Sequence, residues 1–358
     1  MPRALNLKTI KGIDKSDMLG LLLGFPLQCK AAEEMAARAE IKLEKRDFEK
    51  IIFVGLGASA AGGDLIRSYL YLENNRVISV FREYVLPSYV DAKSLVFTLS
   101  YSGNTEETLS AYAQAKKNGA SIVAISSGGK LKEQALKDNV SFVQIPQGSP
   151  PRFALGYLSI IPLCILARFG LIDSVLLQIK ETIALLEDLK NQSLGPRIQA
   201  KDNIAKQAAL RLWNKFAVIY SSSVHFDICA RRLRSQLAEN AKTLSSTQVF
   251  PDINHNEIMG WQNPRKLLKN FVVLMLRDSS MHPRVAKSMD ITRQIVGEEG
   301  VQSLEIYSRG RGLLSRIFSL IYIGDFISFY LAILYSTDPM PIERIDYLKK
   351  KLAQGELI

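Results

Sequence analysis

The stretch SLVFTLSYSGNTEET, residues 94–108, contains the strand-to-helix junction that decides the fold class of this chain. It begins with an apolar run of strand length, and a helical pattern follows Thr105 as far as Gly119, a residue type that commonly ends helices. Ser100 and Ser102 lie between the two patterns, so hydroxyl groups gather where a buried strand ends. Strands this apolar, separated by helices, are typical of parallel sheets that are covered on both faces.

The same alternation continues on both sides of the junction and predicts two α/β units. Strand-like segments in the first half are residues 50–57, 77–83, 94–100, 121–127 and 141–146. Those in the second half are residues 216–222, 247–252, 270–278 and 301–308. Helical patterns lie before, between and after them, at residues 14–43, 58–73, 104–119, 130–139, 153–192, 224–242, 282–300, 313–335 and 342–355.

We therefore predict two doubly wound α/β sandwiches with parallel five-stranded sheets, plus a C-terminal helix. The first domain, with a leading helix, is predicted to cover residues 1–170, a helical linker residues 171–205, and the second domain with the C-terminal helix residues 206–358. A chain of 358 residues is too long for one compact domain of ordinary size, which agrees with this division.

The charge balance is basic, with a formal net charge of +11, and leaves three kinds of partner open: nucleic acid, a membrane surface or anionic small molecules. The basic residues are spread among acidic ones, and no block of five or more lysines and arginines occurs. This pattern lacks the clustered footprint of a nucleic-acid-binding surface, so we expect no nucleic-acid partner.

Two long apolar stretches, residues 153–172 and 313–335, raise the question of a membrane. The first contains Arg168, and the second contains Arg316 and Asp325. A charge deep in a spanning helix costs roughly 2.5–3.5 kcal/mol, so both stretches are predicted to be buried core helices and no membrane partner is expected. The apolar run at residues 19–27 is too short for a signal peptide.

The three cysteines, Cys29, Cys164 and Cys229, are far apart in the sequence. An odd and scattered count argues against a disulfide framework, and the spacing does not suit a zinc site. We expect buried, reduced thiols in a cytoplasmic protein, with no bound metal.

Two loops offer the donors that a phosphate group requires. Ligands of open parallel sheets bind beyond the carboxyl ends of the strands, where helix N-termini favour anions. The glycine-rich turn GLGASAAGG, residues 55–63, brings Gly57 and Ser59 to such a position, and the 94–108 junction brings Ser100, Ser102 and Thr105. The alternative, that these hydroxyls only cap a helix, would suit one hydroxyl better than three.

A dinucleotide site is a second interpretation of the glycine-rich turn. The turn departs from the usual fingerprint around Ser59 and Ala61, and the only acidic residue near the end of the next predicted strand is the poorly placed Glu83. We therefore expect no nucleotide cofactor and predict a phosphate site.

Residues 50–63 and 94–108 resemble a sugar isomerase (SIS) domain, the phosphosugar-binding fold, and two such domains in one chain resemble the phosphoglucose isomerase superfamily. Three further segments, PPRFALGY (150–157), LAENAK (237–242) and NHNEIMGW (254–261), are similar to the bifunctional phosphoglucose/phosphomannose isomerases of archaea and bacteria. The resemblance implies an enzyme that interconverts glucose 6-phosphate and mannose 6-phosphate with fructose 6-phosphate through a cis-enediolate. It also implies a homodimer that needs no metal or other cofactor and that acts in glycolysis and gluconeogenesis.

The resemblance also assigns roles to individual residues. Glu239 is implied to be the base that moves the proton, and Arg152 to stabilise the enediolate oxyanion. The ordinary alternatives are an exposed helical glutamate and a surface arginine. His255 is implied to assist ring opening from across the dimer interface, and Lys349 from the C-terminal helix, with Lys350 as its close alternative.

Some assignments remain open at this stage. Asn254 and Glu257 are expected to orient the histidine loop, and Glu257 is also a second-choice base. Thr337 is a candidate for tolerance of mannose stereochemistry. Two other functions are also open. One is a phosphosugar-binding or phosphosugar-sensing protein without catalysis, and the other is an isomerase of another sugar phosphate, such as an amino sugar phosphate.

Overall fold

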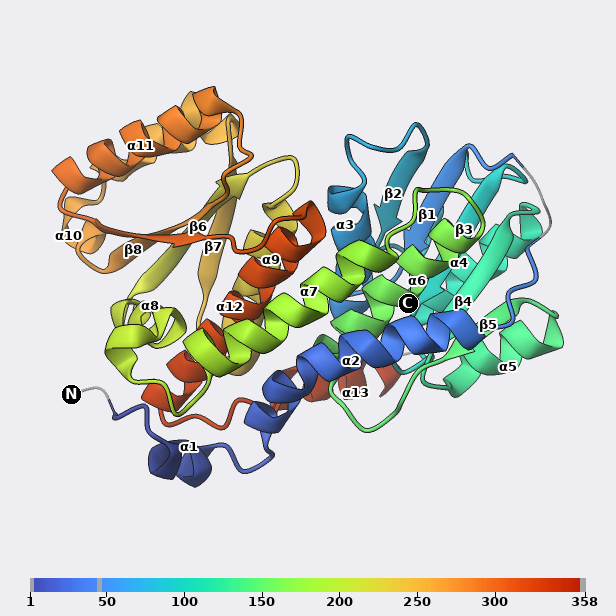
Figure 1. The fold of residues 1–358 in the computed structure, drawn as a ribbon, viewed down its shortest axis with the longest axis horizontal. Coiled ribbons are helices and arrows are strands. Elements are labelled where there is room, and N and C mark those ends of the chain that lie inside the picture. The colour runs from blue at the N-terminus through green and yellow to red at the C-terminus, as the bar shows by residue number, and fades with distance from the viewer. Residues whose placement is uncertain (1–2, 44–46, 355–358) are drawn as a thin grey trace.

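The computed structural model describes residues 3–43 and 47–354, and two parallel sheets frame it (Figure 1). The strands of the first sheet, in the order β2-β1-β3-β4-β5, are Lys50–Val54 (β1), Val77–Phe81 (β2), Ser94–Leu99 (β3), Ser121–Ser126 (β4) and Ser141–Gln144 (β5). Those of the second, in the order β7-β6-β8-β9, are Phe216–Ser222 (β6), Ser245–Phe250 (β7), Phe271–Arg277 (β8) and Gln302–Tyr307 (β9). The two orders match strand for strand apart from β5.

The prediction of five strands in both sheets is therefore wrong for the second sheet, which has four in the described part of the chain. In the first half, helix α5 (Gly129–Lys137) leads into the extra edge strand β5. In the second half, β9 is followed by a continuous apolar run that forms the 22-residue helix α12 (Leu313–Leu334). An apolar run of that length is too long for a strand and forms a buried helix instead.

The remaining helices cover the sheets and lie between them (Figure 1). They are α1 (Leu7–Ile13), α2 (Met18–Arg38), α3 (Ala58–Tyr69), α4 (Glu106–Lys117), α6 (Leu155–Arg168), α7 (Leu176–Leu189), α8 (Ile204–Leu212), α9 (Asp227–Asn240), α10 (Arg265–Leu268), α11 (Pro283–Glu298) and α13 (Glu343–Gln354). Residue 355, the predicted end of the last helix, and residues 356–358 of the predicted second domain lie outside the described residues, as do residues 1–2 of the first.

The predicted leading helix begins later than its pattern suggested, at Met18. The Asp14 carboxylate accepts hydrogen bonds from the backbone N–H groups of Met18 and Leu19, both at 2.8 Å, and Asp17 caps the helix start. Acceptors at a helix N-terminus satisfy N–H groups that have no partner within the helix. Asp14 thus satisfies the start of α2 from the turn that precedes the helix.

One continuous core joins the two halves. Helices α2, α6, α7 and α12 lie between the sheets and bury apolar side chains from both. Helix α12 is long and apolar enough to cross a membrane, but its apolar window is entirely buried within the fold. It serves as the central core helix, and Tyr322 on it donates a hydrogen bond to the Leu22 carbonyl of α2 at 2.8 Å.

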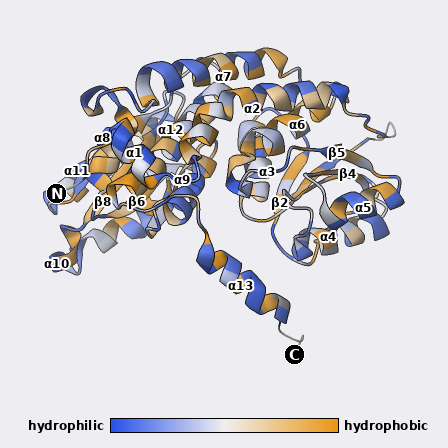
Figure 2. Cartoon of the chain, turned by 90° about the horizontal axis from the view of Figure 1, so that it is seen from below, coloured by the Kyte–Doolittle hydropathy of each residue, from blue (hydrophilic) through white to orange (hydrophobic). Residues whose placement is uncertain are grey.

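Helix α13 is the exception to this packing. It extends away from both sheets (Figure 2), and its apolar residues Ile345, Leu348 and Leu352 are exposed. Their spacing places them along one side of the helix.

Candidate active site between the two sheets

A cavity of about 230 Å³ lies where the first half meets the second. Its walls come from Gly57 and Ala58 at the start of α3, from Arg82 just after β2, from Arg152, and from α9. Parallel strands end at the same edge of their sheet, so this cavity lies at the carboxyl edge of the first sheet, as the strand–loop pattern predicted.

The cavity is strongly basic. Its charged lining consists of Arg82, Arg152, Arg231, Arg232, Arg234, Asp64 and Glu239. Asp64 is buried and pairs with Arg82 from its own half and with Arg231 of α9 at 3.3 Å. Ion pairs thus hold α3 and α9 together at the cavity, and the excess of arginine favours an anionic ligand.

Arg152 is almost completely buried, with 2% of its side chain exposed. Pro150 and Pro151 restrict the backbone before it, and a short 3₁₀ helix, Pro151–Phe153, presents its side chain to α9. Its Nε donates to Asn240 Oδ1 at 2.8 Å, and its Nη2 donates to the Met340 carbonyl at 2.9 Å and the Pro339 carbonyl at 3.1 Å. The remaining nitrogen, Nη1, faces Glu239.

Glu239 lies one residue before the end of α9, and its carboxylate is 3.6 Å from Arg152 Nη1. Its side chain is 28% exposed, so the carboxylate is accessible to a ligand. Burial lowers the pKa of Arg152 and the nearby Glu239 charge opposes that shift. The pair therefore places a cation and an accessible carboxylate at one wall of the cavity, as acid–base chemistry at adjacent carbons requires.

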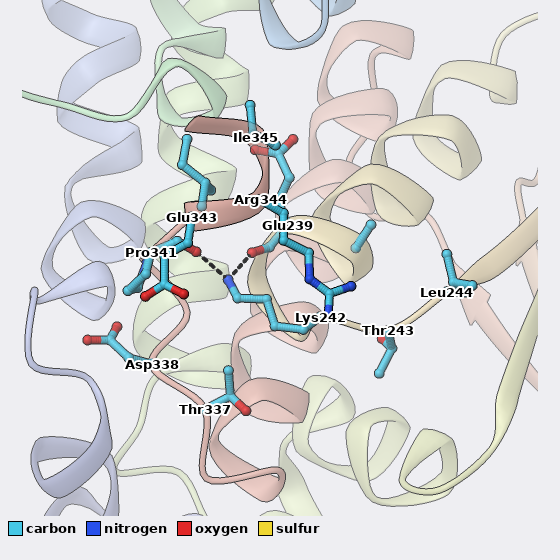
Figure 3. Close-up of a pocket in the computed structure, with 12 residues that line it drawn as sticks. Glu239, Lys242, Thr243, Leu244, Thr337, Asp338, Pro341, Glu343, Arg344 and Ile345 are labelled. Atoms are coloured by element: carbon cyan, nitrogen blue, oxygen red, sulfur yellow. Dashed lines mark hydrogen bonds between the residues drawn. The ribbon is translucent and has the colours of Figure 1, made fainter. Parts of the chain in front are cut away.

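Glu239 also lines a second, larger cavity of about 720 Å³, between the end of α9 and the start of α13 (Figure 3). Lys242 lies beside it and donates hydrogen bonds to the backbone carbonyls of Glu239 and Pro341. Burial and the nearby Arg152 charge lower the pKa of Lys242. Thr337, the candidate for C2 stereochemistry, lines the same cavity as Glu239.

The hydroxyls of the 100–105 loop contact one another. Ser100 Oγ lies 2.9 Å from Thr105 Oγ1 and accepts from the Gly103 N–H at 3.1 Å. Thr105 precedes α4, but within the described chain its side chain makes no capping hydrogen bond, so its hydroxyl is not used as a helix cap. The cap-only interpretation thus fails for Thr105.

The shape of this loop depends on glycine. Gly103 has a φ of +70°, and a Cβ there would meet the Gly128 carbonyl oxygen at 1.8 Å. Ser59 Oγ, from the first residues of α3, accepts a hydrogen bond from the Tyr101 N–H at 3.2 Å. The two predicted phosphate-binding segments are therefore in direct contact, and Gly57 connects them to the cavity that holds Arg152.

The predicted site residues fall into three groups in space. Gly57, Arg152 and Glu239 line one cavity. The hydroxyls of Ser59, Ser100, Ser102 and Thr105 form the adjacent loop cluster, in which Ser102 accepts from the Asn104 N–H at 3.2 Å. His255 and Lys349 are exposed and line neither cavity in this single chain.

The two secondary candidates beside His255 already have structural partners. Tyr220 donates to a Glu257 carboxylate oxygen at 2.7 Å, and Asn254 donates to Ser288 Oγ at 3.2 Å. These bonds attach the loop that carries His255 to the rest of the second half, consistent with the role expected for Asn254 and Glu257. The carboxylate that pairs with Arg152 is that of Glu239.

Three polar residues behind Arg152 were not predicted from the sequence. Arg232, Gln236 and Asn240 lie four residues apart on α9, so they share one helix face, and all three are buried. That spacing of polar residues on a buried face was the available signal. Among the described residues, no cluster of histidine, cysteine and acidic side chains could hold a metal ion.

The fold and the hydroxyl loop define a protein of the sugar isomerase (SIS) class, since the SIS domain model matches residues 44–143. A second model, for the bacterial phospho-glucose isomerase C-terminal SIS domain, matches residues 201–352. A hypothetical protein from Thermus thermophilus has the same fold, with a TM-score of 0.72 over 97% of this chain and 94% of that protein at 15% identity.

Full-length relatives identify the family. A bifunctional phosphoglucose/phosphomannose isomerase from Caldicellulosiruptor bescii is 45% identical over 94% of this chain and 99% of the relative. One from Aquifex aeolicus is 33% identical over 87% of this chain and 93% of the relative. The chain therefore belongs to the family of bifunctional phosphoglucose/phosphomannose isomerases.

Proposed function

We propose that this chain is a metal-independent aldose–ketose isomerase that interconverts glucose 6-phosphate and mannose 6-phosphate with fructose 6-phosphate. The observation that carries the proposal is the Arg152–Glu239 pair, a buried guanidinium 3.6 Å from an accessible carboxylate, at a basic cavity beside the hydroxyl loop. Membership of the isomerase family supports the choice of substrates.

In this proposal the hydroxyls of Ser100, Ser102 and Thr105 and nearby backbone N–H groups bind the substrate phosphate at the start of α4. Glu239 removes a proton from one of the two reacting carbons and returns it to the other. Arg152 Nη1 stabilises the oxyanion that develops on the enediolate between the two steps. Ser59 and Gly57 contact the sugar between its phosphate group and its reacting carbons.

The role of His255 involves a second copy of the chain. His255 is exposed here, so we propose that a homodimer brings it from the partner subunit to the site, where it assists ring opening together with Lys349 of the C-terminal helix. Thr337 is proposed to accept either configuration at C2 from its place beside Glu239. We further propose a cytoplasmic location, which is supported by the burial of the thiols of Cys29 and Cys229.

A direct assay tests the activity. The purified protein is treated with a chelator and given fructose 6-phosphate, and the formation of glucose 6-phosphate and mannose 6-phosphate is followed separately. The proposal predicts both products. The absence of both, with fructose 6-phosphate still bound in calorimetry, would replace it with the phosphosugar-binding alternative.

Mixed dimers test the histidine. His255→Asn and Glu239→Gln variants are purified, mixed, unfolded and refolded together. If His255 acts across the interface, about a quarter of the wild-type activity returns, because half of the random dimers are hybrids with one complete site. No recovery above the separate variants would place His255 in its own subunit's site or outside the site.

A further inference from the structure

A buried ionic group lies behind the proposed active site, in the middle of the most apolar helix of the fold. Helix α12 carries Asp325, whose side chain is 3% exposed. Arg232 of α9 binds both carboxylate oxygens, with Nε–Oδ1 at 3.1 Å and Nη2–Oδ2 at 2.8 Å, and Gln236 donates to Oδ1 at 3.0 Å. The pair connects the central helix of the core to the helix that carries Glu239.

This group also reaches Arg152 by two routes. In the first, Arg232 Nη2 donates to the backbone carbonyl of Arg152 at 3.0 Å. In the second, Ser328 Oγ donates to the Asp325 carbonyl at 2.8 Å and accepts from Asn240 Nδ2 at 2.9 Å. The other end of the Asn240 amide, Oδ1, accepts from Arg152 Nε at 2.8 Å. Both the main chain and the guanidinium of Arg152 are therefore attached to α12.

Stability alone gives a poor reason for such a group. Burying two charges costs free energy that their attraction often fails to recover, and replacing a buried ion pair with apolar residues is frequently neutral or stabilising. Burial indeed raises the pKa of Asp325, and Arg232 opposes that shift. The group does fix the orientation of the Arg152 side chain. Nε and Nη2 of Arg152 are bonded to protein acceptors, and Nη1 is left facing Glu239.

We propose that Asp325, Arg232 and Asn240 are positioning residues that aim Arg152 Nη1 at the oxygens of the reacting carbons and keep it in register with Glu239. The inference rests on the proposed isomerase function. Asn240 directly follows Glu239 on α9, so one helical turn carries both the proton-transferring carboxylate and the group that orients its cationic partner. None of the three needs to touch the substrate for this role.

Two sets of variants separate positioning from folding. In the first, Asn240→Leu removes the partner of Arg152 Nε, and Asn240→Asp keeps an acceptor at that position. In the second, the double variant Asp325→Leu with Arg232→Met replaces the ion pair by apolar residues. Ser315→Ala is the matched control, since Ser315 is also buried on α12 and bonds Thr182 at 3.0 Å, away from Arg152.

For each variant, kcat, KM and the melting temperature are measured with fructose 6-phosphate, beside wild type. We expect kcat to fall about 100-fold in Asn240→Leu and in the double variant, with KM nearly unchanged, because small misplacements of a catalytic group cost about that much. Asn240→Asp recovers part of kcat, and Ser315→Ala keeps it. The melting temperature of the double variant stays near the wild-type value.

Wild-type kcat and KM in both Asn240→Leu and the double variant would overturn the inference while leaving the isomerase function in place. It would also be overturned if the loss of kcat in each variant were proportional to its loss of melting temperature and Ser315→Ala showed the same proportion. If the double variant does not fold, the Asn240 pair decides alone. An inactive wild-type protein contradicts the proposed function instead.

Discussion

The loops after β3 and β8 occupy the same position in the two sheets, but one presents hydroxyl groups and the other contains a buried carboxylate. After β3, the first half presents hydroxyls at residues 100–105 and no acidic side chain before the helix begins. After β8, the second half presents Asp278, whose carboxylate is fully buried and is bound by Arg316 at 2.9 Å and by the Ser280 N–H at 2.7 Å. The second loop supplies its own anion.

Under the proposed function, this difference gives the two similar units different roles. Asp278 directly follows β8, as Ser100 directly follows β3, and its carboxylate accepts internal hydrogen bonds that include one from the Ser308 hydroxyl at 2.5 Å. The first loop has donors to spare for an external anion. The second half contributes Glu239 of α9 to the proposed site, where it faces Arg152 of the first half. In the proposed function the first half therefore binds the phosphate, and residues of both halves carry out the reaction.

The largest effect is expected where the second half contributes its carboxylate. Glu239→Gln keeps the size and one acceptor of the side chain but cannot take a proton. General acid–base catalysis contributes about 10²–10⁴-fold, so kcat should fall by about 10³-fold while calorimetric binding of fructose 6-phosphate is retained. An active variant would remove Glu239 from its role.

The next effect should appear in stability alone. Asp278→Ala leaves Arg316 without its buried partner, and breaking such a pair costs about 3 kcal/mol of unfolding free energy, measured by urea titration. Turnover and KM should stay near wild type, since the second loop binds no substrate. A large rise in KM would contradict the division between the two halves.

In the first half, substitutions in the loop should affect substrate binding more than stability. A Ser102→Ala, Thr105→Ala double variant removes two donors to a charged phosphate, each worth about 1.5–3 kcal/mol, so KM should rise at least about 100-fold. The loss of stability should be smaller than in Asp278→Ala, because Ser102 is exposed and the Thr105 hydroxyl is lost together with one neutral hydrogen bond, to Ser100 at 2.9 Å. Unchanged KM would separate the hydroxyl loop from the phosphate.

The smallest expected effect sharpens the comparison most. Asp278→Ala uncovers donors in the second loop, so inorganic phosphate should stabilise this variant more than wild type, by about 1.4 kcal/mol at tenfold excess over its dissociation constant. Melting curves with and without phosphate measure the increment. If phosphate raised the stability of the variant and of wild type by the same amount, the second loop would not bind phosphate in place of the lost carboxylate.

Much of this arrangement was predictable from the sequence, and the rest depended on distant contacts. Strand-length apolar runs and the 94–108 junction predicted both units, because their signals are local. The five-strand count was wrong for the second sheet, although the second half contains only four strand-length segments and residues 313–335 were themselves predicted as a helix. Arg152 and Glu239 were found by resemblance, whereas their contact and the Asn240–Ser328 bond join residues about 90 positions apart.

His255, expected from a partner subunit, and Lys349, expected from the C-terminal helix, show the same limit. Neither the sequence nor one chain reveals what His255 and Lys349 face, because both are exposed here. The amphipathic pattern of α13 is local and was predicted as a helix, but its extension away from the sheets was not (Figure 2).

A crystal structure with a non-reacting sugar acid phosphate would test the central claim most directly. The account predicts phosphate oxygens within hydrogen-bond distance of Ser102 and Thr105, and the acid end of the ligand between Arg152 Nη1 and Glu239. A phosphate bound instead among Arg82, Arg231 and Arg234, with the hydroxyl loop empty, would contradict it.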